Sequence, residues 1–193
     1  MHTFIALLRG INVGGNTILP MRDLVGMFEG LGLKKVKTYI QSGNVVFQSA
    51  HKNALDLSRK ITAAIEKSCG IAPQVVLLGI KELQAVIASN PFPQGMREPK
   101  SLHLFFLDSV PRNPDLGTLA TLKTKSEQFK LVNQVFYLYA PDGIGDSKLA
   151  AKIERALGVA ATARNWRTVS EVMSIAMALT ALPGTASDGE SRA

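Results

Sequence analysis

Residues 9–16 combine a fixed cation, amide side chains and glycines, which is the chemistry of an anion-binding loop. The residues with these properties are Arg9, Asn12, Gly14, Gly15 and Asn16. Glycines allow positive φ and a close approach of the backbone, so N–H groups can point at a ligand. The loop leads into a helix that starts at Pro20, and a helix N-terminus favours phosphate or carboxylate. An anion is therefore the expected ligand.

The alternative is that this loop only connects two elements. Its glycine spacing does not match the G-x-G-x-x-G fingerprint of dinucleotide-binding domains. One arginine and two asparagines are, however, more than a simple turn requires. Both interpretations stay open at the level of sequence.

A second polar segment, Tyr39-Ile-Gln-Ser-Gly-Asn44, separates two apolar runs and predicts a tight turn. Gln41, Ser42 and Asn44 could line the same anion site as the first loop. Ser, Gly and Asn are also the residues that a hairpin turn demands. These side chains therefore have a structural and a ligand-binding interpretation.

The segment Asp142-Gly-Ile-Gly-Asp-Ser-Lys148 is a second glycine-rich loop that runs into a predicted helix. Asp146 or Ser147 is expected to cap this helix, and Lys148 to contact a phosphate or carboxylate. The Walker pattern G-x-x-x-x-G-K-[ST] is absent. A Ser-Lys nucleophile pair is disfavoured, because adjacent helical residues point about 100° apart.

The segment Thr162-Ala-Arg-Asn-Trp-Arg-Thr168 carries the only tryptophan of the chain. Arg164, Asn165 and Trp166 suit stacking on a flat ring together with contacts to phosphate. In the structural alternative, Thr168 starts a capping box for the last helix and Trp166 fills the junction between two halves.

Hydrophobic periodicity predicts the order βαββαβ twice along the chain. The first copy consists of a strand over 3–9, a helix over 20–31, hairpin strands over 36–40 and 44–48, a helix over 53–69 and a strand over 73–78. A connector helix over 80–89 and a proline-rich loop over 90–99 follow. The second copy consists of a strand over 102–107, a helix over 115–122, hairpin strands over 129–132 and 135–139, a helix over 147–157, an extended piece over 160–163 and a last helix.

The predicted fold class is therefore α+β, with two ferredoxin-like halves packed together and an extra C-terminal helix. The predicted units are an N-terminal subdomain (1–79), a connector (80–100), a C-terminal subdomain with the final helix (101–183) and a disordered tail (184–193). We expect the candidate site residues of both halves to line one shared cleft.

Several phrases of the sequence together resemble the bacterial family called domain of unknown function 1697. They are Leu7–Gly15, Thr38–Phe47, Asn90–Pro93, Asp142–Lys148 and Thr162–Thr168. The resemblance runs from about residue 4 to the final helix. It implies a cytoplasmic α+β protein built from ferredoxin-like subdomains. The family has no assigned activity, so the resemblance implies no substrate.

Composition restricts the classes of function. The chain has 193 residues, 46% of them hydrophobic, which is enough for a substantial core. No run of about 18 apolar residues could cross a membrane, and a single cysteine, Cys69, cannot form an internal disulfide. The three histidines lie far apart, so neither a metal site nor a cofactor is expected. We expect a cytoplasmic protein without a membrane segment.

The net charge of +7 leaves nucleic-acid binding open as a competing function. Residues 1–100 carry 12 Lys and Arg against 6 Asp and Glu, so the positive excess lies in the first half. The predicted strands of the second half contain Phe105, Phe106, Phe136, Tyr137 and Tyr139. RNA-recognition modules use such sheet aromatics, but the basic and glycine residues of their signature are missing.

A small anionic ligand is therefore the expected partner, with RNA as one alternative and a structural or partner-binding role as another. No nucleophile and base can be paired from the sequence, so catalytic residues stay unknown. If a reaction occurs, we expect Arg9, Lys148 and Arg164 to act by positioning and electrostatic stabilisation. The oligomeric state is not specified by any residue pattern.

Overall fold

The computed structural model describes residues 1–13 and 18–181. The predicted site residues Gly14, Gly15 and Asn16 and the predicted disordered tail lie outside the described residues. The first half contains β1 (His2–Leu8), α1 (Met21–Gly30), β2 (Lys34–Tyr39), β3 (Asn44–Ser49), α2 (Ala54–Cys69) and β4 (Val75–Gly79). Its four strands form an antiparallel sheet in the order β2-β3-β1-β4, the arrangement of a ferredoxin-like fold.

The second half repeats this topology. A connector helix α3 (Ile80–Ala88) and a short 3-10 helix η1 (Pro93–Met96) precede it. It contains β5 (Leu102–Leu107), α4 (Leu116–Leu122), β6 (Gln128–Val132), β7 (Val135–Tyr139), η2 (Ala150–Lys152), α5 (Ile153–Leu157), β8 (Ala161–Asn165) and α6 (Trp166–Ala181). The strand order β6-β7-β5-β8 is the counterpart of that in the first half. The predicted α+β fold with two ferredoxin-like halves and a C-terminal helix is confirmed.

Each sheet is covered on one face by the helices of its own half. In the first half, α1 and α2 cover a core that includes Phe4, Phe28, Phe47 and Ile61. In the second half, α4 and α5 cover a second core, which includes Phe136. Alternation along the strands explains this, because every second side chain of a strand faces the same side.

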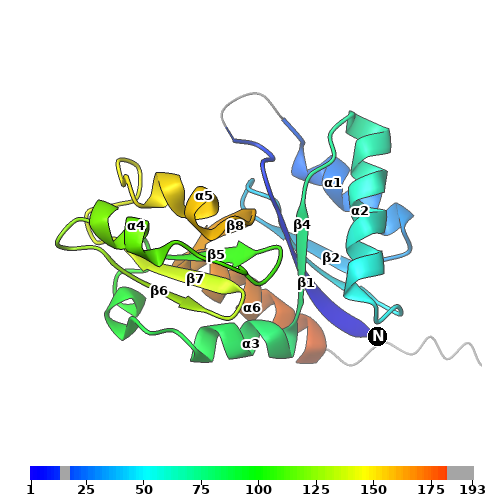
Figure 1. Cartoon of the computed structure of the whole chain (residues 1–193). Coiled ribbons are helices and arrows are strands. Elements are labelled where there is room, and N and C mark those ends of the chain that lie inside the picture. Colours follow the sequence, from blue (N-terminus) through cyan, green and yellow to red (C-terminus); the bar gives the residue numbers. More distant parts are fainter. Residues whose placement is uncertain (14–17, 182–193) are drawn as a thin grey trace, which may run out of the picture.

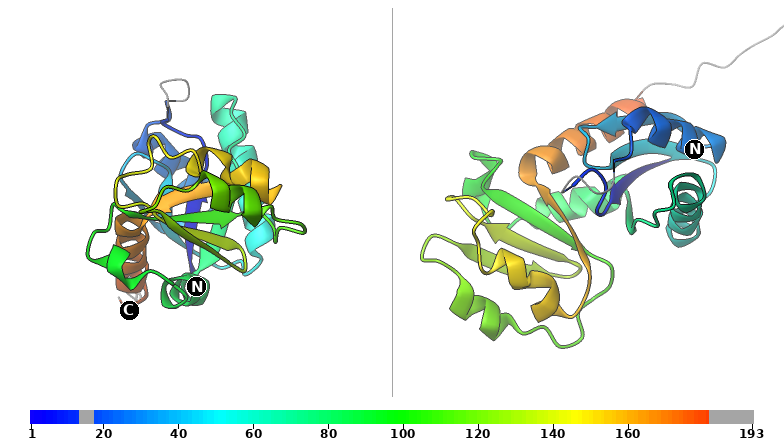
Figure 2. Two further views of the ribbon diagram at one scale, coloured as in Figure 1. Left: turned by 60° about the vertical axis from the view of Figure 1, so that its left-hand side comes forward. Right: turned by 90° about the horizontal axis from the view of Figure 1, so that it is seen from above.

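The opposite faces of both sheets meet in a third core, which the two halves share. Ile5 and Val46 of the first sheet and Leu104 of the second belong to it, together with residues of α3 and α6. In Figure 1, α3 runs along the lower edge of the second half and α6 passes behind the strands; α6 contacts strands of both sheets, and Figure 2 shows it spanning from one half to the other. The C-terminal helix is therefore the element that closes the space between the halves.

Local signals explain both ends of α2. The side chain of Asn53 accepts a hydrogen bond from the backbone of Asp56 at the start of α2, and Gly70 ends this helix at a φ of 70°.

The helix predicted over 147–157 is wrong in its first part. There the chain forms the 3-10 turn η2, and α5 covers only the last residues of the predicted range.

Candidate functional site

The guanidinium of Arg164 connects the second half to the first. Its Nη2 donates to the carbonyl oxygens of Leu8 (2.7 Å) and Ser42 (2.8 Å), and its Nε donates to Oδ1 of Asn44. Its Nη1 donates to the carbonyl oxygen of Ala163 (2.7 Å). The side chain therefore reaches from β8 to the end of β1 and to the β2–β3 hairpin.

Burial lowers the pKa of Arg164 to about 10, because the charged form is removed from water. The group still carries its charge at neutral pH. A buried charge is costly unless its hydrogen bonds are satisfied, and here three of the acceptors belong to the other half. The contacts give Arg164 a structural role at the junction, and its predicted role in ligand binding would have to compete with them.

The polar residues of the hairpin also contact one another. Asn44 is fully buried, and its Nδ2 donates to the carbonyl oxygen of Tyr39 (3.1 Å) and to Oγ of Ser42 (3.0 Å). Gly43 lies between them at a φ of 73°. The structure thus shows the turn role that was one of the two interpretations of this segment.

Asn12 fixes the first loop to the same hairpin. Its Nδ2 donates to the carbonyl oxygens of Leu19 (2.9 Å) and Gln41 (2.7 Å), and its Oδ1 accepts from the backbone of Leu19 (2.7 Å). The side chain of Gln41 itself is exposed. Asn12 therefore joins the two ends of the loop and holds them against the turn, at a φ of 55°.

Arg9 makes a second link between the halves, at the surface. Its Nη2 lies 2.8 Å from Oε2 of Glu154 in α5, and the two side chains are 44% and 43% exposed. Oε1 of the same glutamate accepts from the backbone of Ala161 (2.7 Å). Exposed ion pairs contribute little to the stability of a protein. Arg9 can therefore leave Glu154 and contact a ligand at a small cost in free energy.

The second glycine-rich loop is held by its own polar residues. Oγ of Ser147 accepts from the backbone of Ala150 (3.0 Å), and Asp142 accepts from Oγ of Ser126 (2.6 Å). The predicted helix cap at Asp146 or Ser147 is wrong, because η2 begins only at Ala150 and α5 at Ile153, each after a residue without a side-chain cap. Lys148 is exposed. In the described part of the chain, no hydrogen bond or ion pair joins Ser147 or Lys148 to the residues around Arg164.

The start of α6 differs from the prediction. Oδ1 of Asn165 accepts from the backbone of Thr168 (2.9 Å), so Asn165 is the cap and Thr168 lies in the first turn. The predicted capping box from Thr168 to Glu171 is wrong, because the helix begins two residues earlier, at Trp166. The indole of Trp166 is 5% exposed and packs in the shared core, as the structural interpretation expected.

A pocket of about 310 Å³ lies beside the first turn of α6. Residues from three separate segments line it: Glu98, Pro99, Lys100, Ser101, Ala140, Pro141, Gly143 and Arg167. Its two cations, Lys100 and Arg167, are both exposed. The backbone of Arg167 donates to the carbonyl oxygen of Pro99 (3.3 Å), which fixes the proline-rich loop to the helix start.

His103, on β5, lies three residues after Lys100. Burial lowers the pKa of the imidazole, and a hydrogen bond with the backbone of Lys100 raises it, with burial the larger cause. Its Nε2 is buried and has no hydrogen-bond partner among the described residues. The ring is therefore neutral near pH 7.

The structure brings one group of predicted residues together and leaves others apart. Ser42, Asn44 and Arg164 meet at the junction of β1, the hairpin and β8, and Asn12 holds the first loop to the same hairpin through the backbone carbonyl of Gln41. The side chain of Arg9 instead contacts Glu154 of α5, and the side chain of Gln41 is exposed. Sequence reasoning did not single out Lys100, Arg167 or Glu154. Arg167 belongs to a motif that was noticed, whereas an isolated exposed lysine and a helical glutamate carry no sequence signal.

The aromatic residues that favoured RNA binding are largely buried. Phe105, Phe106, Phe136 and Tyr137 are each less than 9% exposed, and the half-buried Tyr139 packs beside Phe92. Both faces of the second sheet are covered. Because RNA-recognition sheets present their aromatics to the ligand, this surface does not support that mode of binding.

Comparison with known proteins assigns the chain to a family. The family model described as "Protein of unknown function (DUF1697)" matches residues 1–137, and the chain belongs to this family. A search of curated proteins found no match. The solved structure of the conserved bacterial protein SP0830 from Streptococcus pneumoniae is similar in fold, with a TM-score of 0.71 and 22% sequence identity. The similarity covers 91% of this chain and 98% of that protein.

Two further observations concern the described residues alone. None of their helices is both long and apolar enough to cross a membrane. Within the same ranges, no three His, Cys, Asp or Glu side chains gather into a group that could hold a metal ion.

Proposed function

We propose that this protein binds a small anionic ligand, and that the ligand occupies the pocket at the start of α6. The observation that carries the proposal is the convergence of Lys100 and Arg167 on a hollow of about 310 Å³. Gly143 from the second glycine-rich loop forms part of the same wall. Two cations from distant segments, together with a helix N-terminus, provide a field that favours phosphate or carboxylate.

The chemistry of this proposal is the one predicted from the sequence, but the position is different. The prediction relied on Arg9, Lys148 and Arg164 in a cleft between the halves. Arg164 donates its hydrogen bonds to groups of the protein, whereas Lys100 and Arg167 are exposed and line a pocket. We therefore place the ligand at the pocket and keep Arg9 and Lys148 as secondary candidates.

The carboxylate of Glu98 also lines the pocket and restricts the ligand. It repels a bare anion but can accept a hydrogen bond from a hydroxyl or amino group. A phosphate ester of a sugar or nucleoside supplies both an anionic end and such a donor. We infer that such esters bind better than inorganic phosphate does, and that binding takes place in the cytoplasm.

Binding can be tested by thermal unfolding with inorganic phosphate, sulfate, glucose 6-phosphate and AMP at constant ionic strength. A ligand at about 100 times its dissociation constant stabilises the fold by roughly 2.7 kcal/mol, which raises the midpoint by a few degrees. We expect the phosphate esters to give this increase in the wild type. The increase should disappear in Lys100→Gln and Arg167→Gln, whose side chains are exposed.

Lys152→Gln and Arg155→Gln serve as matched controls, because these exposed cations line a different pocket. They should keep the full increase. A ligand-dependent increase that survives in both Lys100→Gln and Arg167→Gln would place the site elsewhere. The absence of any increase at millimolar concentrations would contradict anion binding at this pocket.

A further inference from the structure

The outer edge of β4 has backbone N–H and C=O groups that form no hydrogen bond with another strand. In the first sheet, β4 pairs only with β1, and the backbone of Arg9 donates to the carbonyl oxygen of Gln74 (2.9 Å). Hydrogen-bonded residues alternate in an antiparallel pair, so the N–H and C=O groups of Val75 and Leu77 point away from β1. Within the described ranges, no hydrogen bond reaches these outward groups.

The edges of the two sheets differ in their chemistry. At the opposite edge of the first sheet, β2 carries Lys34, Lys35 and Lys37 and has an irregular register. Such lysines and irregularities prevent an edge strand from pairing with another chain. In the second sheet, the edge strands carry Lys130 and Arg164. By contrast, the β4 sequence Val-Val-Leu-Leu-Gly has no charge, no proline and no irregularity.

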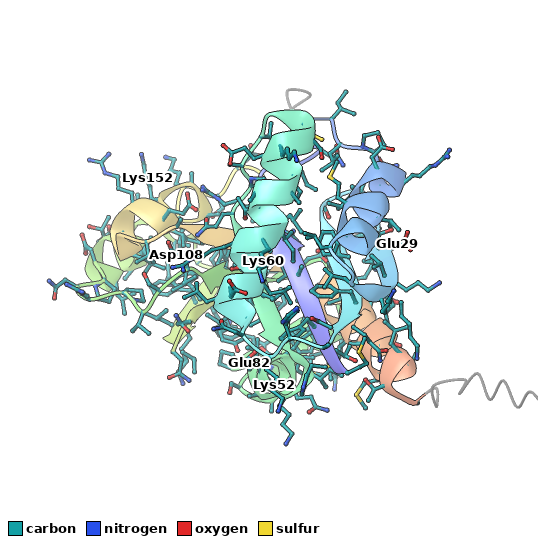
Figure 3. The ribbon with its side chains drawn as sticks, turned by 90° about the vertical axis from the view of Figure 1, so that its right-hand side faces the viewer. Glu29, Lys52, Lys60, Glu82, Asp108 and Lys152 are labelled. Carbon is teal, nitrogen blue, oxygen red and sulfur yellow. The ribbon has the colours of Figure 1, made fainter. Side chains whose placement is uncertain are left out.

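A groove follows this edge. A hollow of about 350 Å³ is lined by Ala54, Leu55 and Ser58 of α2, by residues 74–77, and by Leu107 and Asp108 at the end of β5. A second hollow of about 420 Å³ continues along α2 and shares Ser58, Gln74 and Val75 with the first. In Figure 1, β4 lies between α2 and the second half of the molecule. Figure 3 shows Lys60 on α2 and Asp108 beyond that helix, on the side of the second half.

We propose that β4 receives an extended peptide segment of another protein as a fifth strand. The backbone of the peptide pairs with the free groups of Val75 and Leu77, and its alternate side chains enter the hollow between Leu55 and Leu107. These walls are aliphatic, so aliphatic side chains fit them. The exposed carboxylate of Asp108 lies at the groove and selects a lysine or arginine in the peptide.

The shape of the edge favours a peptide over a second copy of this chain. The strand lies in a groove between α2 and the end of β5, so it is recessed. In a symmetric dimer, the β4 of the second copy would be recessed in the same way, and two recessed edges cannot approach to the strand spacing of about 4.8 Å. A single extended segment can enter.

The proposal can be tested with a displayed library of random 12-residue peptides selected on the full chain. We expect enrichment of peptides with aliphatic residues at alternate positions and one basic residue. Fluorescence anisotropy of a labelled, enriched peptide then gives its dissociation constant. Leu55→Glu should weaken binding about tenfold or more, because it puts a charge into the apolar hollow. Leu55 is 61% exposed, so this substitution leaves the fold intact.

Met96→Glu is the matched control, since Met96 is 50% exposed and does not line the groove. It should bind the peptide like the wild type. On binding, amide exchange should slow at Val75 and Leu77. Equal affinity of the wild type and Leu55→Glu would overturn the proposal, as would unchanged exchange at these two amides. A dimer that Leu55→Glu converts to a monomer would identify a second copy as the occupant instead.

Discussion

Arg164 is the residue on which the junction of the two halves most directly depends. Its guanidinium satisfies two carbonyl groups, those of Leu8 and Ser42, and the side-chain oxygen of Asn44. Replacement by methionine keeps much of the aliphatic packing but leaves these three acceptors without their donor. We expect Arg164→Met to lower the free energy of unfolding by about 3 kcal/mol, as measured by urea denaturation.

Arg22→Met is the control for this prediction, because Arg22 is exposed on α1 and makes no hydrogen bond or ion pair within the described ranges. Its effect should stay within about 0.5 kcal/mol. Arg164→Lys should be intermediate, since an ammonium group can reach only some of the acceptors. If Arg164→Met has the same urea midpoint of unfolding as the wild type, the junction does not rely on this side chain.

His103 makes the stability of the protein depend on pH. Burial lowers the pKa of its imidazole in the folded chain, whereas the unfolded chain keeps a pKa near 6.5. As the pH falls below about 6.5, the unfolded chain therefore binds more protons than the folded chain does, and the free energy of unfolding decreases. His103→Gln removes this contribution, so its stability should fall less between pH 7.5 and pH 5.5.

Urea midpoints of the wild type and His103→Gln at both pH values measure this difference, and carboxylates that also titrate affect both proteins alike. His51→Gln, at an exposed histidine, is the control and should follow the wild type. Parallel decreases in the wild type and His103→Gln would show that the buried imidazole does not contribute.

At the scale of elements, the β2–β3 hairpin depends on Gly43. Its φ is 73°, and a Cβ at this position would lie 2.7 Å from Cδ1 of Ile11 and 2.8 Å from Cβ of Leu8. Alanine would therefore suffer both a strained backbone and a steric clash. We expect Gly43→Ala to destabilise the protein by about 2–4 kcal/mol, measured by chemical denaturation.

Gly10→Ala separates the two causes, because Gly10 has a similar φ of 75° but open space around it. It should cost only about 1 kcal/mol. Equal losses for Gly10→Ala and Gly43→Ala would mean that the close contact with Ile11 relaxes without cost, and that backbone conformation alone requires glycine at residue 43.

Most elements could be predicted from the sequence because each carries its own periodicity and end signals. The strand over 102–107 was predicted with its observed bounds, and α3 within one residue. The first turns of the helix predicted over 147–157 were wrong, since the apolar pattern does not distinguish a 3-10 turn from an α-helix. The cap of α6 was also predicted wrongly. The helix begins at Trp166 and Asn165 caps it, whereas the prediction gave this role to Thr168.

The candidate site was predictable only in part, for a physical reason. The residue types at the junction stand out in sequence, but the partners of Arg164 are a backbone carbonyl 156 residues away and groups of the hairpin. Every residue has a carbonyl, so sequence carries no signal for such partners. The pocket lined by Lys100 and Arg167 likewise forms only in the folded chain, where segments that are far apart in the sequence lie side by side.

For the whole molecule, the shared core decides how the halves depend on each other. The inner faces of both sheets and α6 contribute to it, so neither half can bury its second sheet face alone. Arg164 and the Arg9–Glu154 pair add polar links at the edge of this core. The halves should therefore unfold together, although each has the topology of an independent ferredoxin-like domain.

This cooperativity can be tested with Ile61→Ala, in the core under α1 and α2, and Ile153→Ala, in the core under α5. Both isoleucines are fully buried, and each substitution should cost about 2–5 kcal/mol. Fluorescence of Trp166 reports on the shared core, and circular dichroism reports on all helices. If unfolding is a single transition, each substitution lowers both midpoints equally. If Ile61→Ala shifts only the dichroism midpoint and leaves that of Trp166 unchanged, the first half unfolds on its own, and the shared core does not couple the two halves.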